Sequence, residues 1–218
     1  MTEYAGPSCV LCGVKACTSE PDTKSPPDFC PMPAEGELLA EVEQTYLARD
    51  DLRRMALESA RTEAAGYCRS TRVEEVMDFA RRMGFHKLGI AHCTGLMQEA
   101  KAARDIFAAG GFEVYTVCCK AGSINKEKIG IRDDEKVRPG QYEAMCSPIG
   151  QAALLAKAGT ELNVVIGLCV GHDSLFFMHS KAPATVLVAK DRVLGHNPVA
   201  ALYTSHSYYQ RLSKLSDK

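Results

Sequence analysis

Three short apolar runs, each followed by cysteine, set the main limit on how this chain can fold. Their length and apolar content are typical of parallel strands that are buried on both faces, and a helical pattern precedes or follows each of them. A fourth apolar run comes later in the chain. The pattern predicts an α/β fold, in which a small, doubly wound, mostly parallel sheet has flanking helices. The four runs are residues 87–91, 112–117, 163–168 and 184–189.

The cysteines near the ends of these runs are predicted to lie at one edge of the sheet. Parallel strands end at the same edge, and α/β proteins bind ligands there, in the crevice where the strand order reverses. The strands at 87–91 and 163–168 are expected to flank that crevice. Five cysteines are therefore candidates for binding a cofactor. They are Cys93, Cys118, Cys119, Cys146 and Cys169.

Cys146 comes before a predicted helix rather than after a strand. In Cys146-Ser147-Pro148, Ser147 is expected to cap the helix and Pro148 to occupy its first position. The helix dipole and the free amides of the first turn favour thiolate over thiol at such a place. The same reasoning applies to Cys169. His172, which follows Cys169 closely, is the candidate catalytic residue, as an acid, a base or a hydrogen-bond donor to a cluster sulfur.

Three interpretations of these central cysteines stay open. Each of them can be a small buried apolar residue, as cysteines often are. Three or four of them can hold a [4Fe-4S] cluster or another soft metal, for which Cys119, Cys146 and Cys169 are the first choice; three ligands would leave one metal position open to a substrate. Alternatively, Cys118 and Cys119 exchange with a partner thiol, although neighbouring cysteines form a disulfide only with strain.

The N-terminal segment has a second set of cysteines, spaced C-x2-C-x4-C-x12-C in a stretch rich in Pro, Gly, Ser and Asp. Such a segment cannot build an apolar core, but four thiolates on one metal can supply roughly 10–16 kcal/mol of apparent binding energy. The spacing is neither that of a zinc ribbon nor that of a bacterial ferredoxin, so zinc and a [4Fe-4S] cluster both remain open. A disordered arm with free thiols is the alternative. The predicted metal ligands are Cys9, Cys12, Cys17 and Cys30.

Between these two regions, residues 35–66 have the apolar spacing of one or two amphipathic helices. Thr71 and Glu74 form a capping-box pattern that opens another helix, and Gly84 is expected to end it. Three segments are predicted. They are a cysteine-rich metal-binding module at 1–33, a helical connector packing on the sheet at 34–84, and an α/β domain at 85–218. A charged loop at 122–142 is either a lid or a solvated surface.

Composition excludes several classes of protein. The 218 residues carry 26 Lys and Arg against 27 Asp and Glu, so no strong field attracts nucleic acid or anionic lipid. The chain has no run of about 18 apolar residues and no signal-peptide pattern, which predicts a cytoplasmic protein with no membrane association. Ten cysteines in that compartment indicate metal binding or catalysis rather than disulfides. The common nucleotide, hydrolase and zinc-protease motifs are absent from the sequence.

Several long motifs resemble those of one known family. They are residues 89–96, 111–114 with 118–120, 167–176 and 190–198, together with the N-terminal cysteines. The family is a prokaryotic domain-of-unknown-function family described as cysteine-rich predicted metal-binding proteins. The resemblance covers nearly the whole chain, and it implies metal binding through the N-terminal cysteines but no particular reaction. More loosely, cysteines around a small α/β core resemble desulfidase-type proteins, whose three-cysteine iron–sulfur cluster accepts sulfur from a substrate.

Two functional hypotheses follow. In the first, the N-terminal site is structural or transfers electrons, and the strand-end thiolates bind a second metal or a [4Fe-4S] cluster for redox or sulfur chemistry. Its partners would be a small-molecule substrate or a redox partner protein. In the second, the chain is a non-enzymatic zinc-binding sensor or interaction module. A homodimer is possible in either case, because Tyr203, Tyr208 and Tyr209 lie in a polar C-terminal region.

Overall fold

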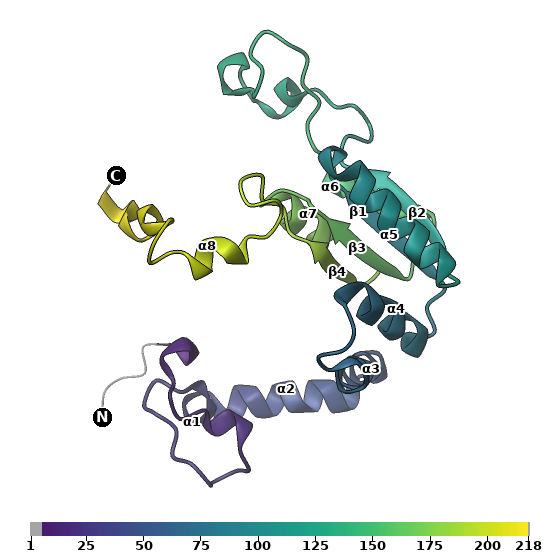
Figure 1. The fold of residues 1–218 in the computed structure, drawn as a ribbon. Helices are drawn as coiled ribbons and strands as arrows, with labels where there is room; N and C mark the ends of the chain where they lie inside the picture. Colours follow the sequence, from purple (N-terminus) through teal and green to yellow (C-terminus); the bar gives the residue numbers. More distant parts are fainter. Residues whose placement is uncertain (1–5, 218) are drawn as a thin grey trace. The chain divides into compact units, whose positions relative to one another are not determined.

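The structure, a computed structural model, describes residues 6–217 and shows two compact units (Figure 1). The first ends at Arg61 and the second begins at Thr62. The outermost ends of the predicted segments 1–33 and 85–218, at residues 1–5 and 218, lie outside the described residues. None of the helices within residues 6–217 has both the length and the apolar character that crossing a bilayer requires.

The first unit is built from short helical elements. It contains the 3₁₀ turns Cys9–Leu11 and Ala16–Thr18, followed by α1 (Pro31–Ala34), α2 (Gly36–Ala48) and most of α3 (Asp50–Gly66). The apolar side chains of α2 are about half exposed, so packing of this helix on the sheet stays a prediction. These exposed residues are Leu38, Leu39, Val42, Tyr46 and Leu47.

The second unit contains a four-stranded, all-parallel sheet. Its strands are β1 (Lys87–His92), β2 (Glu113–Cys118), β3 (Leu162–Ile166) and β4 (Ala184–Val188), in the order β2-β1-β3-β4. The predicted α/β class and doubly wound topology are confirmed, and the sheet is parallel throughout. The chain turns in opposite directions from β1, so the strand order reverses between β1 and β3, as predicted.

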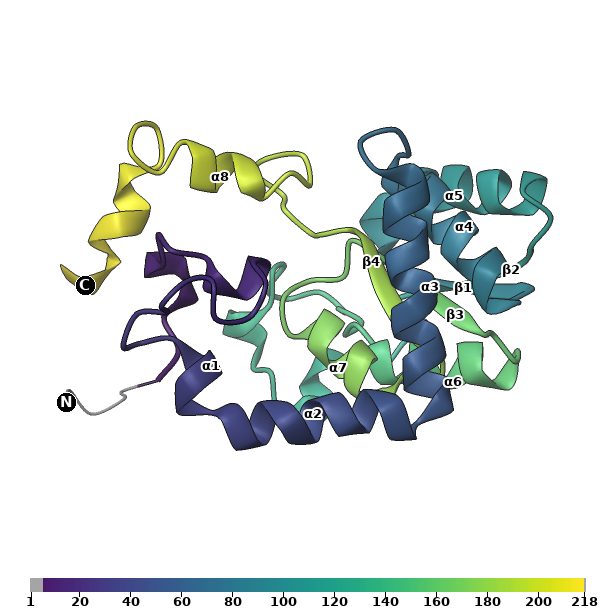
Figure 2. The ribbon, with the colours of Figure 1, turned by 90° about the horizontal axis from the view of Figure 1, so that it is seen from below.

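Helices cover both faces of this sheet, as right-handed crossovers require. Figure 2 shows α4 (Arg72–Met83) and α5 (Met97–Ala109) on one side and α6 (Pro148–Lys157) and α7 (His172–His179) on the other. After β4 the chain forms α8 (Val199–Tyr203) and a 3₁₀ segment, Gln210–Asp217. Strand alternation therefore assigns each side chain of β1 and β2 either to the α4/α5 side or to the α6/α7 side.

The core lies between the sheet and these helices. Phe107 from α5 and Phe176 from α7 are both fully buried, and β1 and β3 present buried side chains on both faces. Gly89 in β1 permits the closest approach, because a Cβ there would lie 2.1 Å from the Asn163 Oδ1 and 3.0 Å from a Leu155 methyl carbon. The buried apolar runs of the sequence are thus the two central strands of the sheet.

The capping box that opens α4 forms as predicted. The Glu74 amide donates to the Thr71 hydroxyl at 3.4 Å, and the Glu74 carboxylate accepts from the Thr71 amide at 2.7 Å. At the other end of the helix, Gly84 adopts φ 74° and its N–H donates to the carbonyls of Ala80 and Arg81. Both helix ends therefore satisfy backbone groups that would otherwise lack partners.

We expect Thr71→Ala to lower the free energy of unfolding by about 1 kcal/mol, because the first turn of α4 loses its hydroxyl acceptor. Urea denaturation followed by circular dichroism measures the change. Glu75→Ala is the matched control, since it alters the same turn without removing a capping-box residue. An equal loss in both variants would show that charge in the first turn, rather than the cap, provides the stability.

Two local expectations need revision. The Ser147 side chain does not cap α6; instead its backbone N–H donates to the Cys119 carbonyl at 2.7 Å, which ties the start of α6 to the end of β2.

The charged loop at 122–142 is also more than a solvated surface. The Lys136 side chain is only 3 % exposed, and its Nζ lies 2.5 Å from the Glu127 carboxylate and 2.9 Å from that of Asp133. The loop is thus organised around a buried cation.

Candidate thiolate centre

Four cysteines converge at the carboxyl edge of the sheet. Cys93 follows β1, Cys119 follows β2 and Cys169 comes shortly after β3, whereas Cys146 precedes α6. The Cys119 and Cys146 side chains share a hydrogen bond, and the Cys119 thiol also interacts electrostatically with Cys93. Arg192 interacts with Cys169, Cys93 and Cys146. We call these four cysteines the strand-end centre.

Backbone amides support the sulfurs of the centre. After β1 the chain turns through Thr94 and Gly95; the Thr94 N–H donates to the Cys119 Sγ and the Gly95 N–H donates to the Cys93 Sγ, each at 3.4 Å. The Cys119 N–H in turn donates to the His92 carbonyl at 2.8 Å. The turn after β1 thus fixes sulfurs from two strands at once.

Positively charged side chains surround the same sulfurs. Lys190 Nζ lies 3.5 Å from the Cys93 Sγ, and Arg192 Nη2 lies 3.0 Å from the Cys169 Sγ. Lys120 and His172 both interact electrostatically with Cys146. Each cysteine of the centre therefore has a cation or a hydrogen-bond donor close to its sulfur.

The Cys119–Cys146 contact separates the acidities of the two thiols. The hydrogen bond from Cys119, helped by electrostatic interactions with Lys120 and His172, lowers the pKa of Cys146 to about 5 despite its partial burial. The same contact and burial raise the pKa of Cys119. The pair therefore holds one proton at neutral pH, on Cys119, with the thiolate on Cys146. The nearby Cys169 similarly raises the pKa of Arg192.

Alkylation of Cys146 in the metal-free protein should rise with pH with a midpoint near 5, because the thiolate is the reactive form and Cys146 is ionised above its pKa. Iodoacetamide labelling at several pH values, with peptide mass spectrometry, measures the midpoint. Lys120→Gln should move the midpoint to higher pH, since it removes a positive charge. Lys157→Gln, at the far end of α6, should not. A midpoint near 9 in the unmodified chain would contradict the assignment.

Among the residues that the structure describes, the buried Gln151 Oε1 and His172 Nδ1 near the centre have no hydrogen-bond partner. Gln151 is fully buried in α6; its Nε2 donates to the carbonyls of His92 at 3.2 Å and Val117 at 2.7 Å, while its Oε1 has no partner. The Nδ1 of His172 is likewise buried without a partner. His172, the predicted catalytic residue, thus lies where it interacts with a centre cysteine and retains a free ring nitrogen.

Cys118 does not join the other four. It pairs with His92 across β1 and β2, and His92 lines a pocket with Thr116, Met97 and other residues of α5. Because paired residues in a parallel sheet face the same side, Cys118 points toward α5, whereas Cys119 meets the segment before α6. The adjacent thiols of Cys118 and Cys119 therefore lie on different faces of the sheet.

The N-terminal cysteines lie in the other unit. Cys9 and Cys17 are exposed, and Cys12 and Cys30 are partly exposed. The Lys15 N–H donates to the Cys12 Sγ at 3.3 Å, with Lys15 in the left-handed region at φ 52°. Within residues 6–217, no group of three or more His, Cys, Asp or Glu side chains is arranged to hold a metal ion. The metal-binding roles predicted for both cysteine sets stay predictions.

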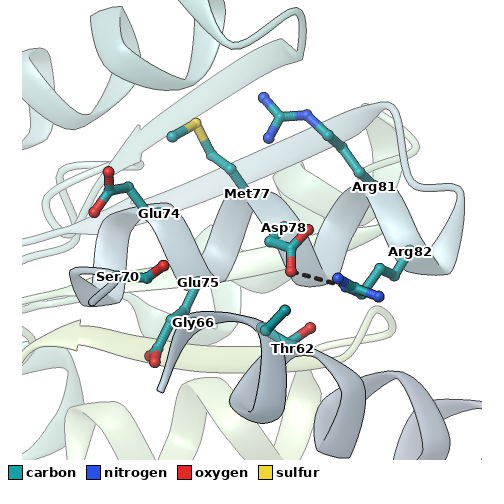
Figure 3. A pocket seen from close by; sticks show the side chains of 10 residues that line it. Thr62, Gly66, Ser70, Glu74, Glu75, Met77, Asp78, Arg81 and Arg82 are labelled. Atoms are coloured by element: carbon teal, nitrogen blue, oxygen red, sulfur yellow. Dashed lines mark hydrogen bonds and ion pairs between the residues drawn. The ribbon is translucent and has the colours of Figure 1, made fainter. Parts of the chain in front are cut away.

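A separate pocket of about 450 Å³ lies between the end of α3 and α4 (Figure 3). Thr62 and Gly66 line it from α3, and Asp78 and Arg82 form an ion pair of 2.8 Å on its α4 side. Its lining contains none of the residues predicted as site residues. The strand-end centre, which contains reactive thiols, is a better candidate for an active site than this pocket.

Comparison with known proteins places the chain in a family. A family model described as "Protein of unknown function (DUF1847)" matches residues 30–187, well over half of the chain. The chain belongs to the DUF1847 family. The matched region contains all four cysteines of the strand-end centre, whereas Cys9, Cys12 and Cys17 precede it. An uncharacterized protein of Methanocaldococcus jannaschii is 40 % identical over 204 residues, which cover 94 % of this chain and 97 % of that protein.

Sequence reasoning identified the cysteines of this DUF1847 protein but missed their charged neighbours. Lys190 and Arg192 follow β4 and lie 97 and 23 residues from the sulfurs that they contact. Lys120 directly follows Cys119, and that adjacency was the available signal. Gln151 was detectable as a polar residue within the apolar first half of α6. The cations were not detectable because only the path of the chain after β4 brings them to the centre.

Proposed function

We propose that this protein binds an iron–sulfur cluster through the strand-end centre and uses it for redox or sulfur chemistry on a small substrate or with a redox partner protein. The proposed ligands are Cys119, Cys146 and Cys169, with Cys93 as the fourth candidate. The observation that carries the proposal is the convergence of four thiols from four chain segments, each with a cation or a hydrogen-bond donor at its sulfur.

The donor set consists of thiols alone. Thiolates are soft ligands that suit zinc, copper(I) and iron–sulfur clusters. Cysteine thiolates are the usual ligands of a [4Fe-4S] cluster, and three of them would leave one iron open to a substrate. The all-cysteine donor set therefore fits a [4Fe-4S] cluster, and metal analysis distinguishes it from zinc.

The surrounding residues have roles consistent with a cluster. A cluster held by thiolates carries net negative charge, which Lys120, Lys190 and Arg192 would offset. Hydrogen bonds to ligand sulfurs help to set the reduction potential of iron–sulfur centres, and the Thr94 and Gly95 amides provide two such bonds. His172, beside Cys146, is positioned to donate or accept a proton during substrate chemistry.

Metal and acid-labile sulfide analysis on protein purified without oxygen tests the proposal, together with an absorption spectrum. The informative variant is the full-length chain with Cys9→Ser, Cys12→Ser, Cys17→Ser and Cys30→Ser. We expect it to retain about four iron and four sulfide atoms per chain. A folded variant that is colourless and metal-free would overturn the strand-end cluster and leave the non-enzymatic sensor as the better function.

We also propose a metal site at Cys9, Cys12, Cys17 and Cys30, holding zinc or a [4Fe-4S] cluster. The observation that favours it is the Lys15 N–H bond to the Cys12 Sγ, because an amide aimed at a cysteine sulfur stabilises the thiolate form that binds metal. Left-handed φ at a residue with a side chain is strained, and a metal-held turn would compensate for it. Comparing the metal content of the unmodified chain with that of the four-serine variant identifies the metal.

A further inference from the structure

The contact between Cys119 and Cys146 joins two thiols of unequal accessibility. Cys119 is 2 % exposed, whereas Cys146 is only partly buried and hydrogen-bonds to Cys119. The backbone also holds the two residues together, because the amide of Ser147 donates to the Cys119 carbonyl at 2.7 Å. Two sulfurs in such contact, one reachable and one enclosed, are the components of a dithiol that exchanges with disulfides.

We propose that the metal-free protein has a thiol–disulfide exchange activity, in which Cys146 attacks a low-molecular-weight disulfide and Cys119 completes the reaction. In the first step the Cys146 thiolate forms a bond to one sulfur of the disulfide R–S–S–R, and the other sulfur leaves as RS⁻. In the second step Cys119 gives its proton to the first RS⁻, and its sulfur then bonds to the Cys146 sulfur and expels the second RS⁻. The two cysteines are oxidised to one disulfide, and R–S–S–R is reduced to two thiols.

The order of the steps follows from exposure and charge. An external disulfide can reach Cys146 but not the enclosed Cys119. Lys120 binds the Ala144 carbonyl at 2.5 Å, which keeps its ammonium close to the segment that carries Cys146 and stabilises the leaving thiolate as well as the attacking one. Cys119 then needs no diffusion, because it already contacts the sulfur that it must attack.

The other cysteines of the region are poorer resolving groups. Cys118 is adjacent to Cys119 in sequence but faces α5, and a disulfide between neighbouring residues would be strained. Cys93 receives hydrogen bonds from the Gly95 amide and from the Lys190 Nζ, whereas the Cys146 side chain hydrogen-bonds to Cys119. The pairing is therefore specific to Cys119 and Cys146.

This activity goes beyond the proposed cluster and belongs to the metal-free state, since metal bound to either sulfur would block it. The two proposals have separate readouts. Iron and sulfide content reports the cluster, whereas disulfide mapping of the metal-free chain reports the exchange, so either can fail alone.

Full-length protein, made metal-free and reduced, is incubated without oxygen with oxidised glutathione and then mapped by peptide mass spectrometry. We expect a Cys119–Cys146 disulfide and about two equivalents of glutathione released by this pair. Cys119→Ser should accumulate glutathione on Cys146, and Cys146→Ser should leave Cys119 reduced. Cys118→Ser, the matched control, should behave as the unmodified chain. Persistent glutathione on Cys146 in the unmodified chain, or a disulfide from Cys119 to Cys118 or Cys93, would overturn the proposal.

Discussion

Cys119→Ser is expected to lower the iron and sulfide content of the strand-end centre by about tenfold or more. Changes to residues that merely support metal ligands cost roughly 10–100-fold in affinity, and loss of a ligand costs at least as much. Cys119 is the member of the centre that contacts Cys146 directly and interacts with Cys93, so its loss affects the whole cluster. The measurement is iron, sulfide and absorbance on protein that also carries the four N-terminal Cys→Ser substitutions.

Cys118→Ser is the control for this experiment, because the adjacent thiol faces α5 and should leave the iron content unchanged. Equal losses in both variants would show that β2 does not divide the two thiols between the faces of the sheet.

Cys93→Ser distinguishes a cluster held by three cysteines from one held by four. Retention of the cluster would mean that three cysteines bind it and that one iron is open to a substrate, whereas its loss would mean that all four are ligands.

Gly89→Ala is expected to lower the free energy of unfolding by about 3 kcal/mol, the upper part of the range for overpacked cores. The added methyl group would lie 2.1 Å from the Asn163 Oδ1. Asn163 cannot move away at low cost, since it is buried, its Oδ1 accepts from the Thr160 hydroxyl at 2.9 Å and its Nδ2 donates to the Ser180 hydroxyl at 2.8 Å. Urea denaturation measures the loss.

Gly95→Ala is the matched control for the central strand. Its new methyl group would meet the Lys190 Nζ at 3.6 Å and the Cys93 Sγ at 3.9 Å, which are ordinary contact distances. We expect a change in stability within about 0.5 kcal/mol, as at surface positions. If Gly89→Ala proved as mild as Gly95→Ala, β1 and β3 would have to pack less closely than the Asn163 contact indicates.

Local patterns were sufficient to predict most of the second unit. Buried strands need continuous apolar runs, and capping residues satisfy amides only one turn away, so β1, β3 and the start of α4 could be recognised from nearby residues alone. The ends of the strands differ from the predicted ranges by one or two residues, except for the first residues of β1 and β4, which agree. The cap expected from Ser147 failed because its backbone is engaged by Cys119, which is distant in sequence.

The arrangement of the cysteines was only partly predictable. A parallel sheet brings the ends of its strands to one edge, which is why Cys93, Cys119 and Cys169 could be expected near one another. The separation of Cys118 from Cys119 depends on which face each residue of β2 occupies. That assignment requires the register with β1 and the positions of α5 and α6, which a single apolar run does not reveal.

The sequence by itself determined the α/β class, the strand order implied by two crossover units, and the group of thiols at the carboxyl edge, because each depends on short-range periodicity or on the general geometry of parallel sheets. The tertiary structure alone decided which thiols share a proton, which cations reach them, and where Gln151 and His172 keep unpartnered atoms. These features depend on contacts between distant segments, such as that between Lys190 and Cys93, which are 97 residues apart. The strength of such contacts changes over a few ångströms, a scale that spacing along the chain does not define.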